Sequence, residues 1–357
     1  MKPVLDRWIA IKRPLSGTGF LPFIVRRLLT SVLLVLGVTL ISFTITQLVP
    51  GDPVAANLGQ SAYSDPEIVA AFEKEFGLDQ PVPTQYYKYL SNLVQGDLGV
   101  SLSSKRPVAE DIREYFPATL EIAVVAVFLS FFIGLFLGII SAITRDKLPD
   151  QIIRVISLTG VSMPAFWTAL TAFYIFFFLL GWAPGTGRLE PGGEPPPTVT
   201  GLFTIDALLV GDFATFRQAF SYLLLPAIVL AIYAVGVLTR FTRASMLEIL
   251  GNDYVRAARA KGLPEYLVIR RHVLRPALLS IITVAGVAFA SLLAGSVLVE
   301  NVFSWPGLGQ YAYRAAIGLD LPGIMGVSMI VATVYILMNL LVDILYRVID
   351  PQMKESK

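Results

Sequence analysis

Residues 248–276 read EILGNDYVRAARAKGLPEYLVIRRHVLRP and show how the whole chain is organised. This basic stretch lies between two apolar runs, 221–244 and 277–299, each long enough to cross a membrane. Connections between membrane spans are usually short, so a long connection that forms helices of its own indicates a specific function. We interpret the stretch as a cytoplasmic docking surface for a soluble partner.

The order of residues within this stretch predicts a bent pair of helices. Asn252 and Asp253 can cap the start of a helix that runs through Lys261. Gly262 is suited to the left-handed residue that ends a helix, and Pro264 can begin the next one. The prediction is a helix–Gly–helix elbow that lies across the membrane surface.

Small and basic side chains alternate along the first helix of this elbow. The small ones allow close approach to a groove on a partner, and the basic ones can form salt bridges around it. The alternative is a polybasic segment that only attracts anionic lipid, at about 1 kcal/mol per basic residue. Lipid attraction requires charge but no order of Ala, Gly and Pro, so we favour docking. The predicted docking residues are Asp253, Tyr254, Arg256, Ala257, Ala258, Arg259, Ala260, Lys261, Gly262, Leu263 and Pro264.

The composition is that of a polytopic membrane protein. Of 357 residues, 55% are hydrophobic and 15% charged, and the mean hydropathy is +0.68. A membrane-spanning helix requires roughly 20 apolar residues. The fold class predicted is therefore all-α, with six transmembrane helices surrounded by membrane lipid, at 26–48, 117–143, 152–181, 221–244, 277–299 and 323–347.

Charge asymmetry orients these spans. One alternating set of connections holds 20 Lys/Arg and 9 Asp/Glu, and the other holds 8 and 16. The positive-inside rule makes the first set cytoplasmic, with both termini inside. The net charge of +2 is a sum over opposite faces, so we expect no nucleic acid partner. The first set is 1–27, 144–154, 240–276 and 343–357, and the second is 49–116, 182–220 and 300–322.

These boundaries divide the chain into a short cytoplasmic N-terminal segment (1–25), a first span, an extracytoplasmic segment (49–116), a five-span core (117–347) and a cytoplasmic tail (348–357). The extracytoplasmic segment is predicted to form a helical cap. Asp65-Pro66 signals one helix start, Pro83 can start a second that ends at Gly96, and Pro107 a third, short one. A tethered loop with no role is the alternative.

The external loop 182–220 contains PGTGRLEPGGEPPP, which cannot hold a regular helix or strand, so we expect it to be extended or mobile. The apolar residues 203–220 that follow predict one or two short helices. A second external loop, 300–322, contains WPGLG.

Two further sets of residues are candidates for a cavity or gate. Ser162, Met163 and Pro164 break the third span, because proline removes a helix hydrogen bond. A packing kink and a cavity wall are equally open interpretations of this break. Trp305, Pro306 and Gly307 predict a tight external turn that gates the outer mouth or contacts an external protein.

Ionisable residues near the membrane mostly favour structural roles. Glu121 and Glu300 are expected at the membrane interface, whereas a proton-coupled transporter would bury a carboxylate near the midplane. Asn339 and Asp343 lie one turn apart, and a pair with an arginine of a neighbouring span is favoured over a proton relay. With no cysteine and His272 as the single histidine, no metal site is expected.

Several motifs together resemble one family. DYVRAARAKGL and RRHVLRPAL are similar to the EAA loop of ABC importer permeases, in the form found in dipeptide, oligopeptide and nickel transport systems. Arg256 stands where the general pattern has Glu, which is typical of the peptide branch. The motifs PGDP (50–53), GLDQPVPTQYYKYL (77–90), GDLGVSL (96–102), ENVFSWPGLG (300–309) and LLVDILYRVIDPQ (340–352) resemble the first, B-type permease of that branch.

The resemblance implies a type I importer permease fold in the cytoplasmic (inner) membrane of a bacterium or archaeon. It also implies a second homologous permease subunit, two ABC ATPase subunits and an extracytoplasmic solute-binding protein. The elbow would be the coupling helix that docks on an ATPase. The chain has no G-x-x-x-x-G-K-[ST] sequence, so we expect no enzymatic activity and no cofactor in it, with ATP and Mg bound by the partner ATPases.

Short peptides are the cargo that the resemblance favours, and nickel chelates, glutathione and oligosaccharides are alternatives carried by related importers. Two other classes of function stay open. A secondary transporter would work without ATPase subunits, and a membrane scaffold would show no substrate flux.

Overall fold

The computed structural model describes residues 20–48 and 52–349, and these contain helices but no named strand. The predicted all-α class is confirmed. The helices are α2 (Phe20–Leu48), α3 (Pro53–Tyr63), α4 (Pro66–Phe76), α5 (Val82–Val94), α6 (Val108–Ile143), α7 (Leu148–Ser162), α8 (Ala165–Phe173), the π-helix η1 (Tyr174–Leu179), α9 (Phe203–Leu209), α10 (Phe213–Leu250), α11 (Asp253–Ala260), α12 (Glu265–Leu267), the π-helix η2 (Val268–Leu274), α13 (Arg275–Gly295), α14 (Val297–Val302), α15 (Leu308–Ile317) and α16 (Leu321–Ile349).

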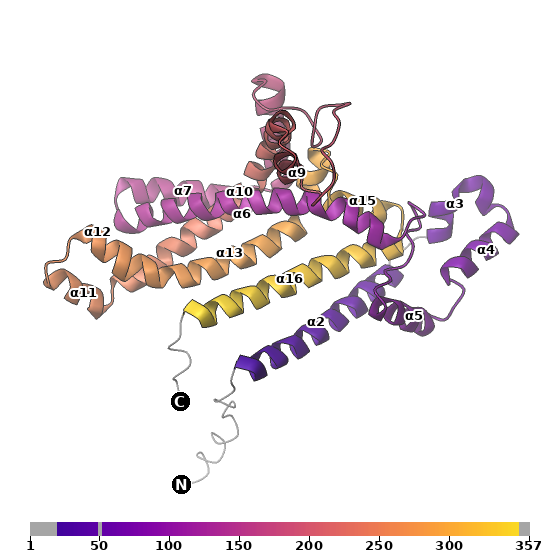
Figure 1. The fold of residues 1–357 in the computed structure, drawn as a ribbon, viewed down its shortest axis with the longest axis horizontal. Helices are drawn as coiled ribbons and strands as arrows, with labels where there is room; N and C mark the ends of the chain where they lie inside the picture. Colours follow the sequence, from indigo (N-terminus) through magenta and orange to yellow (C-terminus); the bar gives the residue numbers. More distant parts are fainter. Residues whose placement is uncertain (1–19, 49–51, 350–357) are drawn as a thin grey trace, which may run out of the picture.

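Long apolar helices run side by side along the long axis of the molecule (Figure 1). Five helical stretches are long and apolar enough to cross a membrane, and α7 with α8 and η1 makes a sixth only if this bent pair is one span. The helix axis bends by 101° between the two halves. Met163 and Pro164 both have extended backbones at the break. For Met163 the cause is the proline that follows it, because a residue before proline is disfavoured in the helical region. The break predicted at Ser162, Met163 and Pro164 in the third span is therefore confirmed, and the sharpness of the bend leaves open whether the two halves form one span or a re-entrant loop.

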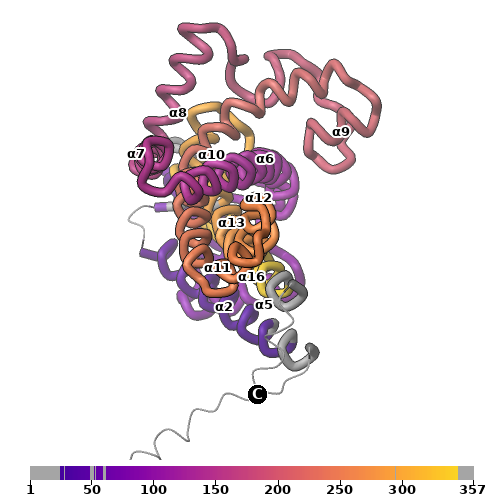
Figure 2. The backbone as a smooth tube through the Cα atoms, turned by 90° about the vertical axis from the view of Figure 1, so that its left-hand side faces the viewer, coloured from indigo at the N-terminus to yellow at the C-terminus, as the bar shows by residue number. Residues whose placement is uncertain are grey.

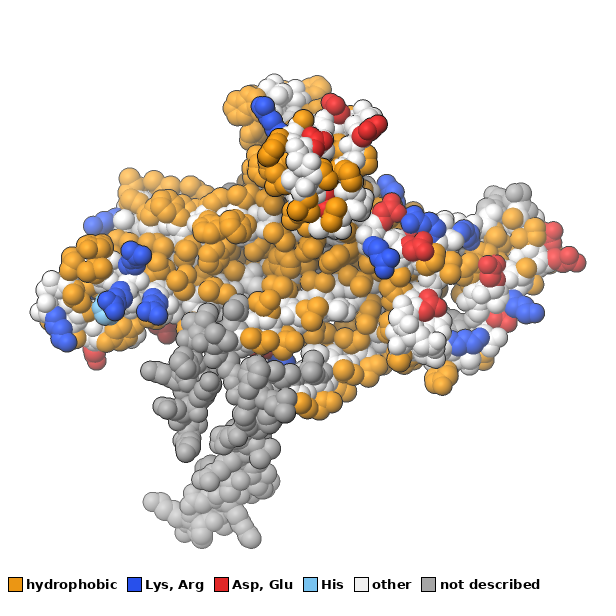
Figure 3. All heavy atoms as spheres, viewed as in Figure 1, with side chains coloured by type: hydrophobic (Ala, Val, Ile, Leu, Met, Phe, Trp, Pro, Cys, Tyr) orange, Lys and Arg blue, Asp and Glu red, His pale blue; other side chains and the backbone are white. Residues whose placement is uncertain are grey.

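The two ends of the bundle differ in charge. Lys and Arg side chains gather at the end formed by α11 and α12, and acidic side chains are more frequent at the end formed by α3, α4 and α5 (Figure 3). The described start of α2 and the described end of α16 both lie toward the basic end (Figure 1). Residues 1–19 and 350–357, which make up the remainder of the two predicted cytoplasmic terminal segments, lie outside the described residues.

The described part of the segment that is predicted to be extracytoplasmic forms a group of short helices beyond the ends of the long apolar helices (Figure 1). Asp65 caps α4 through a hydrogen bond from the Glu67 N–H, as the sequence predicts, and the Phe72 and Phe76 rings pack against each other on one face of that helix. The expected third short helix is wrong, because the helix that follows Pro107 is α6, which continues unbroken as a span. The sequence also did not reveal α3, although Asp52 caps it.

The core lies between α6 and α10, with α7 and α13 on either side (Figure 2). Ala118, Ile122 and Ala126 of α6 pack against Leu223 and Leu230 of α10. Small residues on α6 bring the two helix backbones close together, as helix packing in membranes favours. This four-helix core holds the elbow at one end and the external loops at the other.

Candidate functional site

The elbow has the shape that its sequence predicts. Helix α11 begins at Asp253, after Asn252, and ends before Gly262, whose φ is +77°. Only glycine adopts that left-handed conformation without strain, so the turn depends on this residue. Pro264 then precedes a helix that continues through η2 into α13, so the second arm of the elbow is continuous with a membrane-spanning helix.

One face of α11 belongs to the permanent core of the chain. Val255 and Ala258 are buried, and they pack in a cluster with Met246, Val268 and Val273. The spacing of three residues places both side chains on the same side of the helix. The expectation that Ala258 contacts a partner is therefore wrong, since its methyl group already faces this chain.

The other face of the elbow carries exposed apolar surface. Tyr254 is 46% exposed, Leu263 37% and Tyr266 67%, and the methyl groups of Ala257 and Ala260 are exposed beside them. Aromatic side chains of this kind supply much of the binding energy at protein interfaces. Tyr266 was not among the predicted docking residues. Its position directly after the Pro264-Glu265 helix start was the signal that could have found it.

Two arginines of the elbow form ion pairs within the elbow. Arg256 lies 2.5 Å from Asp253, and Arg259 binds both carboxylate oxygens of Glu265 at 2.6 and 3.1 Å. The hydrogen bond with Glu265 raises the pKa of the Arg259 guanidinium. Exposed pairs contribute only about 0–1 kcal/mol to stability, but this one joins the two arms across Gly262. The elbow is thus shaped before any partner binds.

The break in the third span borders an open cavity of about 570 Å³ that is lined by residues of α7, α8, α10 and α13. Of the three predicted residues, Met163 lines it, whereas Ser162 and Pro164 are exposed and are not among its lining residues. Polar groups reach the cavity from three elements: Thr168 of α8, Tyr233 of α10 and Ser291 of α13. A mostly apolar cavity with a few polar groups is typical of a ligand path.

The turn around Trp305 is buried. Trp305 is 1% exposed, and its ring N–H donates to the Ala118 carbonyl at 2.9 Å. Gly307 is buried as well, Pro306 is half-buried, and the next backbone N–H, of Leu308, donates to the Thr119 hydroxyl at 2.7 Å. The burial of Trp305 and Gly307 leaves little surface there for an external protein to contact, and the predicted role of this turn as a gate of the outer mouth stays a prediction.

Beside this turn, two carboxylates that were expected at the membrane interface are buried. Glu121 lies 2.6 Å from Arg188 and also accepts hydrogen bonds from Thr204. Glu300 accepts hydrogen bonds from the Thr119 and Ser296 hydroxyls and from the Gln310 N–H. The Glu121 contacts with Arg188 and Thr204 and the Thr119–Glu300 hydrogen bond fasten the segments 182–204 and 300–309 to α6.

Arg188 belongs to the loop that was predicted to be extended or mobile. Its guanidinium lies 3.5 Å from the centre of the Phe203 ring and 3.0 Å from the Gly201 carbonyl. Burial lowers the pKa of this arginine. The loop is therefore anchored at Arg188, which the glycine- and proline-rich sequence around it did not indicate.

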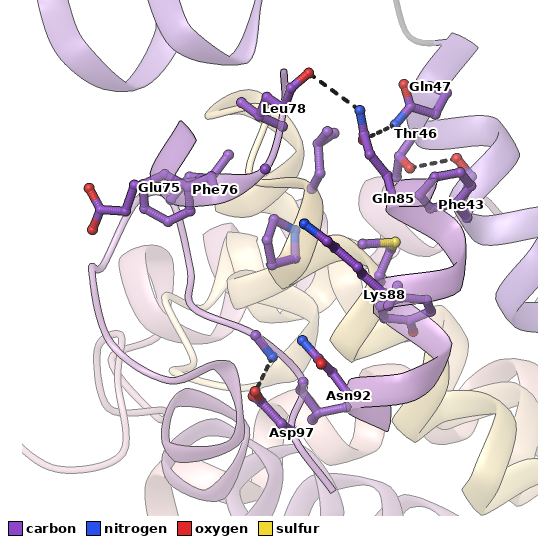
Figure 4. Close-up of a pocket in the computed structure, with 18 of the residues that line it drawn as sticks. Phe43, Thr46, Gln47, Glu75, Phe76, Leu78, Gln85, Lys88, Asn92 and Asp97 are labelled. Atoms are coloured by element: carbon purple, nitrogen blue, oxygen red, sulfur yellow. Dashed lines mark hydrogen bonds between the residues drawn. The ribbon is translucent and has the colours of Figure 1, made fainter. Parts of the chain in front are cut away.

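A second cavity, of about 290 Å³, lies between the cap and the outer ends of α2 and α16. Figure 4 shows Lys88 and Asn92 of α5 projecting toward it, with Phe43 and Gln47 of α2 beside α5 and Phe76 of α4 on the other side. The Gln47 amide donates to Gln85 across this junction at 3.1 Å. These contacts seat the cap on the membrane helices.

At the other end of α16, Asp343 forms an ion pair with Arg27 of α2. The predicted pairing of this carboxylate with an arginine of a neighbouring span is confirmed. It joins the first and last spans near the basic end of the molecule.

Comparison with known families decides the assignment. A family model described as binding-protein-dependent transport system inner membrane component matches residues 134–355, and a model of the N-terminal membrane component of such systems matches residues 20–123. The chain belongs to this family. It is a permease subunit of an ABC importer, a multi-pass membrane protein that works within a complex of several subunits.

Relatives of this permease match along nearly their whole length. The probable D,D-dipeptide transport system permease of Escherichia coli is 45% identical over 90% of this chain and 94% of its own. The di/tripeptide transport system permease of Pseudomonas aeruginosa is 42% identical, over 94% of this chain and 100% of its own. Among solved structures, the inward-facing MetNI methionine ABC transporter covers 65% of this chain and 93% of its own, at 18% identity and a TM-score of 0.47.

Proposed function

We propose that this permease imports short peptides in the cytoplasmic membrane of a bacterium or archaeon. The proposal is supported by relatives named as dipeptide and di/tripeptide permeases at 40 to 45% identity. Related importers carry nickel chelates, glutathione or oligosaccharides, and these are the competing cargoes. A second homologous permease subunit completes the path, and a solute-binding protein delivers the cargo from outside.

The observation that carries the mechanism is the divided surface of the elbow. Val255 and Ala258 face the chain, whereas Tyr254, Leu263 and Tyr266 are exposed at the basic end of the molecule. Two ABC ATPase subunits serve the complex, and one of them docks on this exposed face. These subunits bind ATP and Mg and hydrolyse the ATP, and this chain catalyses no reaction itself.

The substrate path is proposed to run along the cavity beside the broken third span. Thr168, Tyr233 and Ser291 offer hydroxyl groups that can hydrogen-bond a peptide main chain, and Met163 adds a flexible apolar contact. Because α10 and α13 both border the cavity and both lead into the elbow, movement of the elbow changes the shape of the cavity walls.

The experiment is ATP-driven uptake of a labelled dipeptide by the complete complex in liposomes. Uptake should require the ATPase subunits and the loaded binding protein, and unlabelled dipeptide should compete better than glutathione, a nickel chelate or an oligosaccharide. Uptake that persists without ATPase subunits would show a secondary transporter, and binding of proteins without any flux would show a scaffold.

A matched pair of glycine variants tests the elbow itself. Gly262→Pro forces a negative φ where the backbone needs +77°, so it should abolish uptake while ATP hydrolysis continues. Gly77→Pro makes the same change in the cap, at a glycine with φ +68° and equally open surroundings, and should leave the coupling of hydrolysis to uptake intact. Normal uptake by Gly262→Pro complexes would contradict the docking role.

A further inference from the structure

Asp150 is a fully buried carboxylate at the basic end of the bundle, and three groups bind it through four hydrogen bonds. The Arg243 guanidinium donates to both of its oxygens, at 2.8 and 2.7 Å. The Ser141 hydroxyl and the Asp146 N–H donate to it at 2.5 and 3.0 Å. A buried carboxylate is costly unless it is paired and hydrogen-bonded, and removing one partner of a buried pair is strongly destabilising. This pair joins α7 to α10 through a two-pronged contact.

The helices joined by this pair also touch along their backbones. A side-chain carbon added at Gly236 of α10 would lie 2.5 Å from the Ser157 carbonyl oxygen of α7. One added at Gly138 of α6 would lie 2.5 Å from Thr242, the residue before Arg243. Figure 2 shows α6, α7 and α10 side by side. At these glycines no side chain separates the helix backbones, so the close contact resists sliding of one helix along another.

The Asp150–Arg243 pair lies between the two parts of the molecule that the transport cycle must connect. Arg243 is on the last turns of α10, which leads directly into the elbow. Asp150 is in the first turn of α7, whose other end is the break where Met163 lines the cavity. The ion pair and the glycine-lined packing beyond it thus form a direct contact through which a displacement of α10 by the elbow can be passed to α7.

We propose that the Arg243–Asp150 pair is a strut that makes α7 follow α10 when the elbow moves, so that the cavity wall changes with the ATPase cycle. Arg243 is thereby a positioning residue for transport. The proposal rests on the proposed function, because it assigns a role within ATP-driven import. Lysine cannot replace arginine here, since a single ammonium group cannot bind both carboxylate oxygens in the fixed geometry of a guanidinium.

The test compares Arg243→Lys with Arg240→Lys in the complete importer in liposomes. Arg240 is on the same helix, one turn earlier, and is exposed. The measured quantity is substrate taken up per ATP hydrolysed, which does not depend on how much complex assembles. Arg243→Lys should lower this ratio at least about fivefold, the lower end of typical coupling energies, and Arg240→Lys should leave it unchanged.

An unchanged ratio in Arg243→Lys would overturn the proposal, since a purely structural role reduces uptake and hydrolysis in parallel. Absence of ATP-driven uptake by the wild-type complex would instead count against the proposed function. A second measurement leaves the Arg243–Asp150 pair intact. Spin labels at positions 154 and 240, both exposed, report the distance between α7 and α10. That distance should be the same with and without ATP, and a shift between the two states would also overturn the proposal.

Discussion

Replacing Tyr266 with alanine should weaken binding of the ATPase subunits to the permease pair by about 30-fold. The ring is 67% exposed at the elbow. A buried aromatic side chain covers about 200 Å², so full coverage by a partner would bury about 130 Å² more. At about 25 cal/mol per Å² this contributes roughly 3 kcal/mol. Ordering the side chain costs about 1 kcal/mol, which leaves about 2 kcal/mol, or about 30-fold in affinity.

The assay is titration of purified ATPase subunits onto the permease pair in lipid nanodiscs. Tyr87→Ala is the matched control, because Tyr87 is 73% exposed in the cap at the opposite end of the molecule. The control should bind the ATPase subunits as the wild type does. Equal affinity of Tyr266→Ala and wild type, or equal losses in both variants, would refute the reasoning that the exposed elbow face binds the ATPase.

Three other predictions concern the extracytoplasmic side. Arg188→Met leaves Glu121 buried without its cation, so it should lower the free energy of unfolding by about 3–5 kcal/mol and increase hydrogen exchange in the loop around 188–204. The control Arg217→Met, at an exposed site, should change neither quantity. Burial alone would raise the pKa of Asp206, but hydrogen bonds from Thr200 and neighbouring N–H groups hold it below 3.8. This stabilisation is therefore present above about pH 4 and lost as pH falls further, so protection of residues 199–206 from exchange should drop in acid, and Asp206→Asn should remove that dependence. A cysteine at Asn92, exposed in the cap, should react with an impermeant label in intact cells, and labelling only after lysis would reverse the topology.

Features that depend on neighbouring residues in the chain could be predicted from the sequence. The elbow is an example, since Asn252 before a helix, Gly262 after it and Pro264 beyond it each act on their own backbone. The start of α4 at Asp65 is another. The apolar runs likewise located the spans, because each long helix must present a nearly continuous apolar surface to lipid.

Features that depend on contacts between distant residues could not be predicted. Trp305 and Arg188 lie in sequences rich in glycine and proline, which indicate loops, yet both are buried against α6. Their burial is decided by a carbonyl at Ala118 and a carboxylate at Glu121, far away in sequence. The sequence also could not distinguish the buried face of α11 from its exposed face. Ala257 and Ala258 are the same residue type, and only packing against α10 and η2 buries Ala258.

That pair of alanines allows the most direct test of the central claim, that an ATPase subunit docks on the elbow. The chain has no native cysteine, so Ala257→Cys and Ala258→Cys can be compared in a transport-active complex with a short cross-linker. Ala257→Cys should cross-link to an ATP-binding subunit, and Ala258→Cys, buried in the chain, should not. Failure of Ala257→Cys to cross-link to an ATP-binding subunit, or equal cross-linking at both positions, would contradict the account.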